Sequence, residues 1–598
     1  MRKRRIEPAK RRPARESGKS DHKTWIPLIP CALALGAYLP SLASGFIYDD
    51  QLQIVKNPQV QSWEYLPRLL TTNLWSQPGI VQNVSFYRPL FSVWMLLVNT
   101  VGGLSPWFWH LSSILLHVAA TYLVFRLVKE LLQDELAAGF AALLFAVHPV
   151  HVDAVSWVSA GNEILFTLFG LGSMLLLIAG TKSGFTNPSR FAGSVGLFAA
   201  ALFSKETAIG LLPVLAVIAF ASGDKPWQER LKGTLKLGPW YLLAVVFYFG
   251  VRWLVLQRVG VETGTHTWQQ VLCSAPSIIV FYWKKLIFPL QLSGFYVNRL
   301  ISTTTPSMWL TLAVILAGIA LLIWLAVRYS PVVAIGGALL FFPLLPLLAG
   351  VRVYQQGDMT HDRYLYLPSI GLCLLIGLIV KRLWAEQQFF KPALLTLGLL
   401  WAGVFAYLTV AQQSYYKDDE VFYQRGIAID PSNVLVIDDL GITYLNDGQS
   451  EKALEQFRNA YRIAPGDPNV TFHLARGLFE THQYAAAEPL FQELSRSPQP
   501  DSTRMKKILL TLADVEISLG NLPEATQALQ RLNLLDPDFP GLHRTLGIVF
   551  QRQGQIAEAQ AEYAKEFQVS GDLEAKQQAD GLARFMLSVH KDSSSSTR

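Results

Sequence analysis

Charged residues are scarce in this chain. Asp, Glu, Lys and Arg make up 16% of its 598 residues, against about 25% in an average soluble domain, while 51% are hydrophobic. This composition excludes an ordinary soluble protein and predicts several membrane spans. Cysteine is scarcer still: Cys31, Cys273 and Cys373 all lie within apolar runs. They match no disulfide framework and no spacing of zinc ligands.

The excess positive charge of the chain lies in one short segment and not over its surface in general. Residues 1–23 hold ten Lys or Arg against three acidic residues, so their net charge of +7 equals that of the whole chain. A dispersed basic surface is therefore excluded, and we expect no nucleic-acid partner. A short basic segment beside an apolar run follows the positive-inside rule, so we expect residues 1–23 to form a disordered cytoplasmic tail.

Apolar windows long enough to cross a bilayer core, about 20 residues each, recur along residues 24–414. They predict eleven spans, near residues 24–46, 107–130, 136–150, 161–181, 190–204, 207–222, 237–256, 307–328, 330–350, 364–381 and 391–412. The first lacks a small-residue cleavage site, so we expect it to remain as an anchor. In residues 268–290, Lys284, Lys285 and Pro289 favour a re-entrant or interfacial helix over a twelfth span.

The distribution of the loops predicts their sides. With the N-terminus in the cytoplasm, most Lys and Arg of the short loops lie inside. The loops that carry Asp49 and Asp50, HPVHVDAV (148–155), SKE (204–206) and DMTHDRYLYLP (358–368) then share the opposite face. An odd number of spans also brings residue 415 and everything after it to that face.

A repeat begins where the apolar windows end. From residue 434 a 34-residue period predicts tetratricopeptide repeats, with further units from 468, 506 and 540. The first unit carries the small and aromatic residues that such repeats need, Gly441, Tyr444, Ala453, Phe457, Ala460 and Pro465. The small residues let paired helices approach closely, and the aromatic ones fill the gaps between pairs. We expect an α-solenoid over residues 415–585 and a disordered Ser-rich tail over 586–598.

Two neighbouring carboxylates end the first span. Asp49 and Asp50 stand in FIYDDQLQIVKNPQV, at the start of a long polar loop. Adjacent like charges disfavour each other's ionisation, which suits a general base or a cation site better than a helix end. On these residues alone, two solvated caps remain the alternative.

More polar residues surround a short turn in HPVHVDAVSWVSAGNEILF (148–166). It carries His148, His151, Asp153 and Glu163. We expect Asp153 to be a second acidic group that faces Asp49 and Asp50. The two histidines lack the helix and the third ligand of a zinc site, and an interfacial loop is the alternative.

The remaining candidates are mostly basic. Lys205 and Glu206 end another span, either as a snorkelling ion pair or as substrate contacts. Arg363 begins a later span and Arg88 stands in FYRPL. A guanidinium group binds phosphate through two parallel hydrogen bonds, so both are candidate phosphate ligands. Anchoring to lipid headgroups is the alternative.

Taken in order, these strings resemble one family. YDD…NP, SFYRPL, FWHLSSILLHVAA, LLFAVHPVHVDAVSW, LFSKETAIGLLPV, YFGVRWLVL, YWKKLIFPLQLSGFYV and DRYLYLPSIGLCLL, followed by the repeats, are similar to the transmembrane and tetratricopeptide repeat-containing O-mannosyltransferases and their prokaryotic relatives. The resemblance covers nearly the whole chain from residue 24. It implies an all-α protein, with a polytopic membrane domain of the glycosyltransferase C type over 24–414 and a tetratricopeptide solenoid after it.

Individual residues carry the resemblance further. Asp49 and Asp50 match the acidic pair of the family, and Asp153 stands where eukaryotic members commonly have Glu. The Asn–Pro–Ala segment of the eukaryotic enzymes is not evident around 258–268, which favours a prokaryotic relative in a bacterial inner membrane.

The resemblance implies a glycosyltransferase that moves a hexose such as mannose from a polyprenyl-phosphate carrier to an acceptor hydroxyl, Ser or Thr of proteins, on the extracytoplasmic face. Asp49 or Asp50 would take the hydroxyl proton, and Arg363, or second Arg88, would stabilise the leaving phosphate. Metal dependence stays open, because paired aspartates suit Mg²⁺ or Mn²⁺. The alternatives are a transferase for a glycolipid or an envelope polysaccharide, and a non-catalytic scaffold whose repeats bind protein partners.

Overall fold

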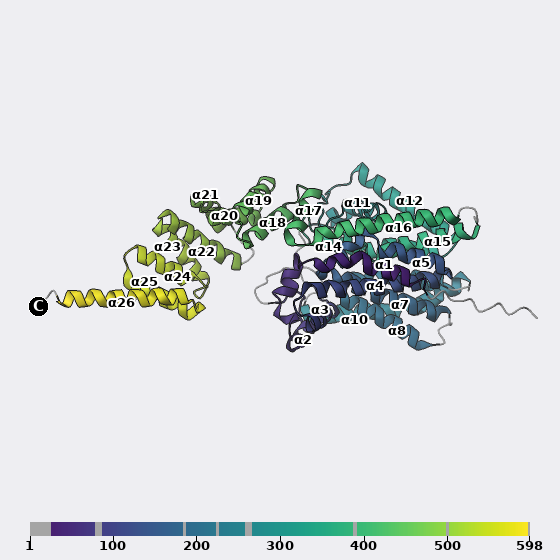
Figure 1. Ribbon diagram of the computed structural model, residues 1–598, viewed down its shortest axis with the longest axis horizontal. Coiled ribbons are helices and arrows are strands. Elements are labelled where there is room, and N and C mark those ends of the chain that lie inside the picture. The colour runs from purple at the N-terminus through teal and green to yellow at the C-terminus, as the bar shows by residue number, and fades with distance from the viewer. Residues whose placement is uncertain are drawn as a thin grey trace, which may run out of the picture.

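The chain folds into two helical parts that lie end to end. The computed structural model describes residues 25–77, 86–182, 187–222, 226–257, 266–386, 391–497 and 502–595, so the predicted basic tail at 1–23 lies outside the described residues. Within these ranges the chain forms helices and one isolated β-bridge, between Tyr296 and Gly357. Figure 1 shows a bundle of long helices and, extending from one end of it, a smaller coil of helix pairs. The predicted all-α fold is confirmed.

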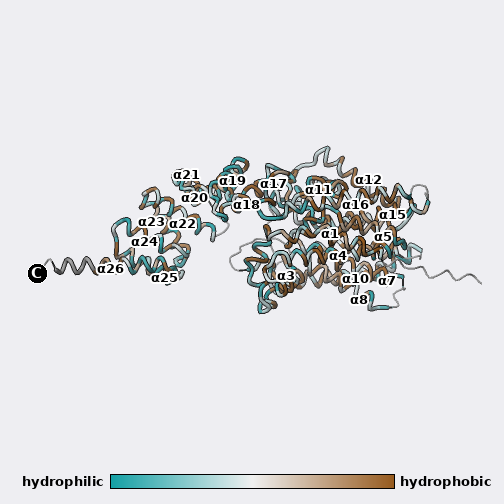
Figure 2. Tube along the Cα trace, viewed as in Figure 1, coloured by the Kyte–Doolittle hydropathy of each residue, from teal (hydrophilic) through white to brown (hydrophobic). Residues whose placement is uncertain are grey.

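The bundle contains most of the apolar residues (Figure 2). Its α-helices are α1 (Leu28–Tyr38), α2 (Leu66–Thr71), α3 (Pro89–Gly102), α4 (Pro106–Leu132), α5 (Glu135–Ala146), α6 (Val152–Val155), α7 (Gly161–Lys182), α8 (Pro188–Ser204), α9 (Leu211–Ala221), α10 (Trp227–Leu256), α11 (Trp268–Ile287), α12 (Pro306–Arg328), α13 (Val332–Phe341), α14 (Leu347–Val351), α15 (Pro368–Glu386) and α16 (Lys391–Gln413). The alanine-rich α5 packs against α1, α4, α15 and α16, because its small side chains let several helices approach at once.

Seven described helices are long and apolar enough to cross a membrane. They are Pro106–Leu132, Val158–Lys182, Trp227–Leu256, Pro306–Arg328, Val332–Val351, Pro368–Glu386 and Lys391–Tyr416. An eighth results if α5 and Pro149–Val155, bent by 52°, count as one span. Leu28–Ala43, Pro89–Gly102 and Glu206–Ala221 are apolar but shorter, and α11 is not among the seven. The chain is a multi-pass membrane protein, and the count of eleven spans stays a prediction.

The second part, called the array below, consists of α17 (Asp419–Ile429), α18 (Val434–Asn446), α19 (Ser450–Ile463), α20 (Pro468–Glu480), α21 (Tyr484–Arg496), α22 (Ser502–Leu519), α23 (Leu522–Leu535), α24 (Leu542–Arg552), α25 (Ile556–Ser570) and α26 (Leu573–Ser595). The repeat pattern has a direct physical cause: a Cβ at Gly441 would clash with the Phe457 ring of the partner helix, and Gly547 faces Tyr563 in the same way. The predicted tetratricopeptide solenoid is confirmed.

The two ends of the array differ from a simple tethered module. At its start, α16 passes directly through the short turn Ser414–Tyr416 into α17. At its end, α26 continues to Ser595, so most of the tail predicted to be disordered over 586–598 is helical. A helix that has already formed several turns adds further residues at little cost, which explains the extension.

Candidate functional site

Loops far apart in the sequence meet at the end of the bundle that adjoins the array. Ser159 N donates to Asp50 Oδ1 at 2.7 Å, across 109 positions. Arg363 N donates to Asp153 Oδ2 at 2.9 Å, across 210 positions. The structure therefore brings three separate sequence segments, those of Asp50, of Asp153 and Ser159, and of Arg363, into one region.

Asp50 is held entirely by the backbone. Its side chain is buried, and its two carboxylate oxygens accept the N–H groups of Ser159, at 2.7 Å, and Ile47, at 3.2 Å. Burial raises the pKa of Asp50 to about 7, while these hydrogen bonds lower it. Because both oxygens are engaged, Asp50 braces the turn before it, and the pair Asp49–Asp50 does not present two free carboxylates to one metal ion.

Asp49 has the opposite environment. It is half-buried, and its side chain makes no hydrogen bond within the described residues. Its pKa is raised from 3.8 to about 8, chiefly by burial and then by the nearby Asp358, whereas Arg363 lowers it. A carboxylate with a pKa close to neutral and no committed partner is suited to accept a proton.

The turn that presents Asp49 is strained. Tyr48 has φ +48°, a left-handed conformation that costs a bulky residue about 1–3 kcal/mol and persists only where the surroundings impose it. Its ring packs against Trp157 and Phe295, with centroids 5.5 and 5.2 Å away. Its backbone N–H donates to Asp419 Oδ1 of the array at 2.6 Å. Strained backbone of this kind is concentrated at functional sites of proteins.

Asp153 holds Arg363 instead of facing the acidic pair. It is buried, and Oδ1 accepts the hydroxyl of Tyr416 at 3.0 Å while Oδ2 accepts the backbone N–H of Arg363 at 2.9 Å. The prediction that Asp153 is a second acidic group facing Asp49 and Asp50 is wrong, because both of its oxygens are turned to these donors.

The guanidinium of Arg363 lies in an aromatic cradle. Its Cζ is 4.2 Å from the centroid of the Trp157 ring and 5.3 Å from that of Tyr364. Nη1 lies 3.6 Å from Asp153 Oδ2 and has no hydrogen-bond partner among the described residues. Flat rings on a cation leave its N–H edge directed elsewhere. Arg363 therefore has hydrogen-bonding capacity for an anion.

The other predicted ionic residues form two pairs. Arg88 donates two hydrogen bonds to Glu206, Nε to Oε2 at 3.0 Å and Nη2 to Oε1 at 2.6 Å. Lys205 forms a buried ion pair with Glu163. The predicted snorkelling pair between Lys205 and Glu206 is wrong, because each bonds a residue of another loop. Arg88 already engages a carboxylate, so it is a weaker phosphate ligand than Arg363.

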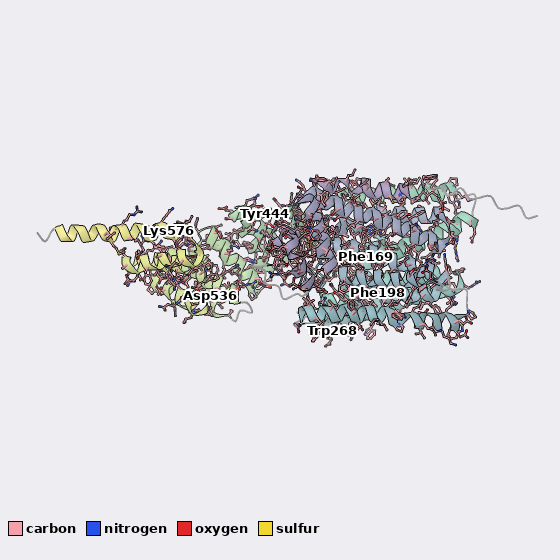
Figure 3. All side chains as sticks on the ribbon, turned by 90° about the horizontal axis from the view of Figure 1, so that it is seen from below. Phe169, Phe198, Trp268, Tyr444, Asp536 and Lys576 are labelled. Carbon is pink, nitrogen blue, oxygen red and sulfur yellow. The ribbon has the colours of Figure 1, made fainter. Side chains whose placement is uncertain are left out.

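A basic pocket of about 280 Å³ adjoins Arg363. Its charged lining residues are Arg88, Lys205, Glu206, Arg252 and Arg352, and its apolar walls include Trp268, Leu347 and Met359. Tyr364 links the pocket to Arg363, because it lines the pocket and its ring centroid lies 5.3 Å from Arg363 Cζ. Trp268 lies at the array end of the bundle (Figure 3). The sequence prediction missed Arg252, although a charge inside the apolar helix α10 is itself a signal.

The two histidines point away from this site. His148 Nε2 contacts the carbonyl of Leu286 at 3.0 Å, and His151 Nε2 contacts Ser369 Oγ at 2.8 Å. The His151 ring packs against Phe145 and Tyr366, and the His148 ring packs against Phe405. They are core residues that brace the turn before Asp153. The structure therefore places His148 and His151 in the core and not in the site, and only their tertiary contacts show this. Within the described residues, no three His, Cys, Asp or Glu side chains form a group that could hold a metal ion.

Two acidic residues that the sequence prediction did not single out border Asp49. Asp358, in the loop before Arg363, raises the pKa of Asp49, and Asp439, on α18 of the array, lies near both. Burial, then Asp438 and Asp358, raise the pKa of Asp439. The array therefore contributes charge to the edge of the site. Tyr444, on the same helix, marks this junction in Figure 3.

Known proteins share both parts of the chain. Residues 87–254 match the family described as dolichyl-phosphate-mannose-protein mannosyltransferase. Tetratricopeptide repeat families match residues 422–455, 444–509 and 478–544. The solved structure of YrrB, a tetratricopeptide protein, aligns at 15% identity with a TM-score of 0.25, over 34% of this chain and 97% of YrrB. Together the sequence families define a membrane domain of a glycosyltransferase type joined to tetratricopeptide repeats.

Curated relatives combine the same two parts. The protein O-mannosyl-transferase Tmtc1 of Drosophila melanogaster is 27% identical over 78% of this chain and 65% of its own length. The human protein O-mannosyl-transferase TMTC3 is 24% identical over 88% of this chain and 62% of its own length. The chain is a homologue of these proteins, as the resemblance in its sequence predicted, and it spans less than two thirds of their length.

Proposed function

We propose that the protein is a membrane glycosyltransferase that moves mannose, or a similar hexose, from a polyprenyl-phosphate carrier to a Ser or Thr hydroxyl of a protein. The observation that carries this proposal is the position of Asp49, a half-buried carboxyl group that makes no hydrogen bond to the residues the structure describes, beside Arg363 and a basic pocket. The activities named for the relatives and for the matched family support the choice of sugar and acceptor.

The pocket suits the donor. A polyprenyl phosphate combines an anionic head with an apolar chain, and the pocket combines Arg88, Lys205, Arg252 and Arg352 with apolar walls. A cation-lined pocket with low-dielectric walls attracts a phosphate more strongly than an exposed basic surface does. The proposed donor phosphate lies between these cations and Arg363.

The proposed reaction is a single displacement. The acceptor oxygen attacks the anomeric carbon while Asp49 takes its proton. The bond from that carbon to the phosphate oxygen breaks, and the phosphate leaves with the electron pair, so the configuration inverts. A positioned base of this kind contributes about 10²–10⁴-fold. Arg363 stabilises the charge that develops on the leaving phosphate.

The remaining carboxylates have other roles in this proposal. Asp50 braces the turn that presents Asp49, and Asp153 places Arg363. Glu163 and Glu206 balance Lys205 and Arg88. Dependence on Mg²⁺ or Mn²⁺ is tested by assaying the chelator-treated protein with and without each ion.

Purified full-length protein, a panel of polyprenyl-phosphate sugars and a panel of acceptors test the proposal. We expect release of polyprenyl phosphate that depends on a Ser- or Thr-containing protein, with the glycan and its site identified by mass spectrometry. Release only with glycolipid or polysaccharide acceptors would establish the alternative transferase. No release with any donor, in protein that is folded by circular dichroism, would leave a scaffold function.

The proposed location is a bacterial inner membrane, with the N-terminus in the cytoplasm and with the site and the array on the extracytoplasmic face. Asn446 ends α18 and is exposed, so Asn446→Cys reports the side of the array. We expect it to react with a membrane-impermeant maleimide added outside intact spheroplasts. Labelling only after permeabilisation would locate the array, and the site that it adjoins, in the cytoplasm.

A further inference from the structure

The first residues of the array contact both halves of the site. Asp419 Oδ1 accepts the backbone N–H of Tyr48 at 2.6 Å, next to Asp49. The hydroxyl of Tyr416 donates to Asp153 Oδ1 at 3.0 Å, and Asp153 in turn binds Arg363. The carbonyl of Lys417 accepts the N–H of Gly45 at 2.9 Å. One segment of four residues, 416–419, therefore reaches the proposed base and the proposed phosphate ligand.

On the side of the base, the contact acts through strain. Tyr48 has a left-handed backbone, and such a conformation persists only when several contacts impose it. Asp50 fixes the turn by accepting hydrogen bonds from the N–H groups of Ser159 and Ile47. Asp419, in the array, fixes it by accepting the N–H of Tyr48. The rings of Phe422 and Tyr423 on α17 lie 6.5 and 6.2 Å from that of Tyr48. Among the described residues of the array, Asp419 is the one that forms a hydrogen bond with the backbone of Tyr48.

On the side of the phosphate, the contact acts through a buried carboxylate. Tyr416 and Asp153 are both 1% exposed, and the phenol is the partner of Asp153 Oδ1. A buried carboxylate oxygen that loses its donor reorients or recruits water. Either change moves the acceptor that holds the backbone of Arg363.

We propose that Asp419 and Tyr416 are positioning residues: Asp419 places Asp49 through the Tyr48 peptide, and Tyr416 places Arg363 through Asp153. The inference rests on the proposed function for the roles of Asp49 and Arg363. It makes the start of the array a part of the catalytic structure. The array, proposed here to hold the protein acceptor, is then joined mechanically to the reacting groups at α17.

Kinetics of full-length variants test this directly. Asp419→Ala removes the acceptor of the Tyr48 N–H, so we expect kcat to fall about 10- to 100-fold, with the KM for the donor unchanged. Asp419→Asn keeps an oxygen acceptor and should recover most of kcat. Tyr416→Phe should instead raise the donor KM, because it acts on Arg363. A kcat of Asp419→Ala within twofold of the wild type would overturn the role of Asp419, and an unchanged donor KM in Tyr416→Phe that of Tyr416.

Asp418 provides the matched control. It is the adjacent aspartate, it caps α17 by accepting the N–H of Val421 at 2.9 Å, and it does not bond Tyr48. Asp418→Ala removes a carboxylate and loosens the same helix end, yet we expect its kcat to stay within about threefold of the wild type. An equal loss in Asp418→Ala and Asp419→Ala would overturn the specific role of Asp419.

Amide hydrogen exchange separates this inference from the proposed function. Asp419→Ala should speed exchange of the Tyr48 amide, measured on a peptide that spans residues 46–52, and Asp418→Ala should not. This readout requires no turnover. Unchanged exchange in Asp419→Ala overturns the inference even in an active enzyme. Faster exchange in a protein that transfers no sugar supports the positioning role of Asp419 and rejects the proposed function.

Discussion

The two sides of Arg363 hold ionisable groups of opposite kind, mostly basic on one side and carboxyl groups on the other. On the pocket side, Arg88, Lys205, Arg252 and Arg352 surround one carboxylate, Glu206. On the side of the array, four carboxyl groups lie near one another, those of Asp49, Asp358, Asp419 and Asp439. The first group is contributed by the bundle alone, whereas the second includes two residues of the array.

The difference matches the two ends of a displacement reaction. A leaving phosphate requires fixed positive charge, and an attacking hydroxyl requires a proton acceptor. Burial, and after it the nearby carboxyl group of Asp358, raise the pKa of Asp49 to about 8, so this side chain is able to gain and lose a proton near neutral pH. Burial of ionic groups is costly, so a scaffold without chemistry has no physical reason to keep both groups at one junction.

The sharpest test of the comparison separates Asp49 from Asp50. Asp49→Asn should lower kcat about 10²–10⁴-fold with donor binding intact, because it removes only the proton acceptor. Asp50→Asn is also expected to lose activity, but through the turn: its amide N–H₂ would face an N–H group of Ser159 or Ile47, at a cost of about 1–3 kcal/mol of stability. Turnover and thermal unfolding of both variants distinguish the two effects. Near-normal turnover of Asp49→Asn would rule out this base.

Arg363 tests the boundary between the two sides. Arg363→Met should lower kcat/KM by about 10²–10³-fold, the usual effect of removing one donor to a developing anion. Arg363→Lys keeps the charge but loses the planar fork and its stacking on Trp157, so it should recover only part of the loss. Arg328→Met, in the last turn of α12, is the matched control and should be active. Equal activity of Arg363→Met and the control would contradict the assignment.

The acidic side also predicts a pH profile. Asp49 must be ionised to accept a proton, and its pKa is raised to about 8, so kcat/KM should fall roughly tenfold per unit as the pH drops below 8. The profile of Asp49→Asn should lack this limb. A wild-type enzyme that keeps full kcat/KM down to about pH 5 would show that the working base has an ordinary carboxyl pKa.

Parts of this site were predictable from sequence for a physical reason. The repeat pattern reflects local contacts such as Gly441 against Phe457, which follow from helix periodicity. The convergence of Asp49 and Arg363 on one region agrees with the alternation of loops between the two ends of a bundle. The first argument needs only the period of the repeat, and the second needs only the order of the loops along the chain.

Other parts depend on contacts that no local pattern encodes. Asp49 and Asp50 look equivalent in sequence, and they differ because Ser159, 109 positions away, donates to Asp50. His148 was predicted to be a site residue, but it contacts the carbonyl of Leu286, 138 positions away. No local sequence pattern indicates that contact. Asp439 was overlooked because nothing in its repeat indicates that the array packs against the bundle.

The smallest expected effect concerns the array beyond its first helices. Deletion of residues 466–598 keeps α17–α19, and hence Asp419, Asp439 and the contacts of Tyr416. Transfer to a large protein acceptor should fall severalfold, on the order of 5- to 10-fold, and transfer to a short Ser-containing peptide should stay near normal. Binding energy remote from the reacting hydroxyl matters only for the larger acceptor.

Deletion from residue 415 is the contrasting variant, because it also removes Tyr416 and Asp419, and it should lose transfer to both acceptors. The two deletions therefore separate acceptor recruitment from the arrangement of the site. If the shorter deletion impairs the peptide and the protein equally, the distal repeats do not select acceptors. If the longer deletion keeps peptide transfer, the acidic side of the site is complete without the array, and the comparison drawn between the two sides fails.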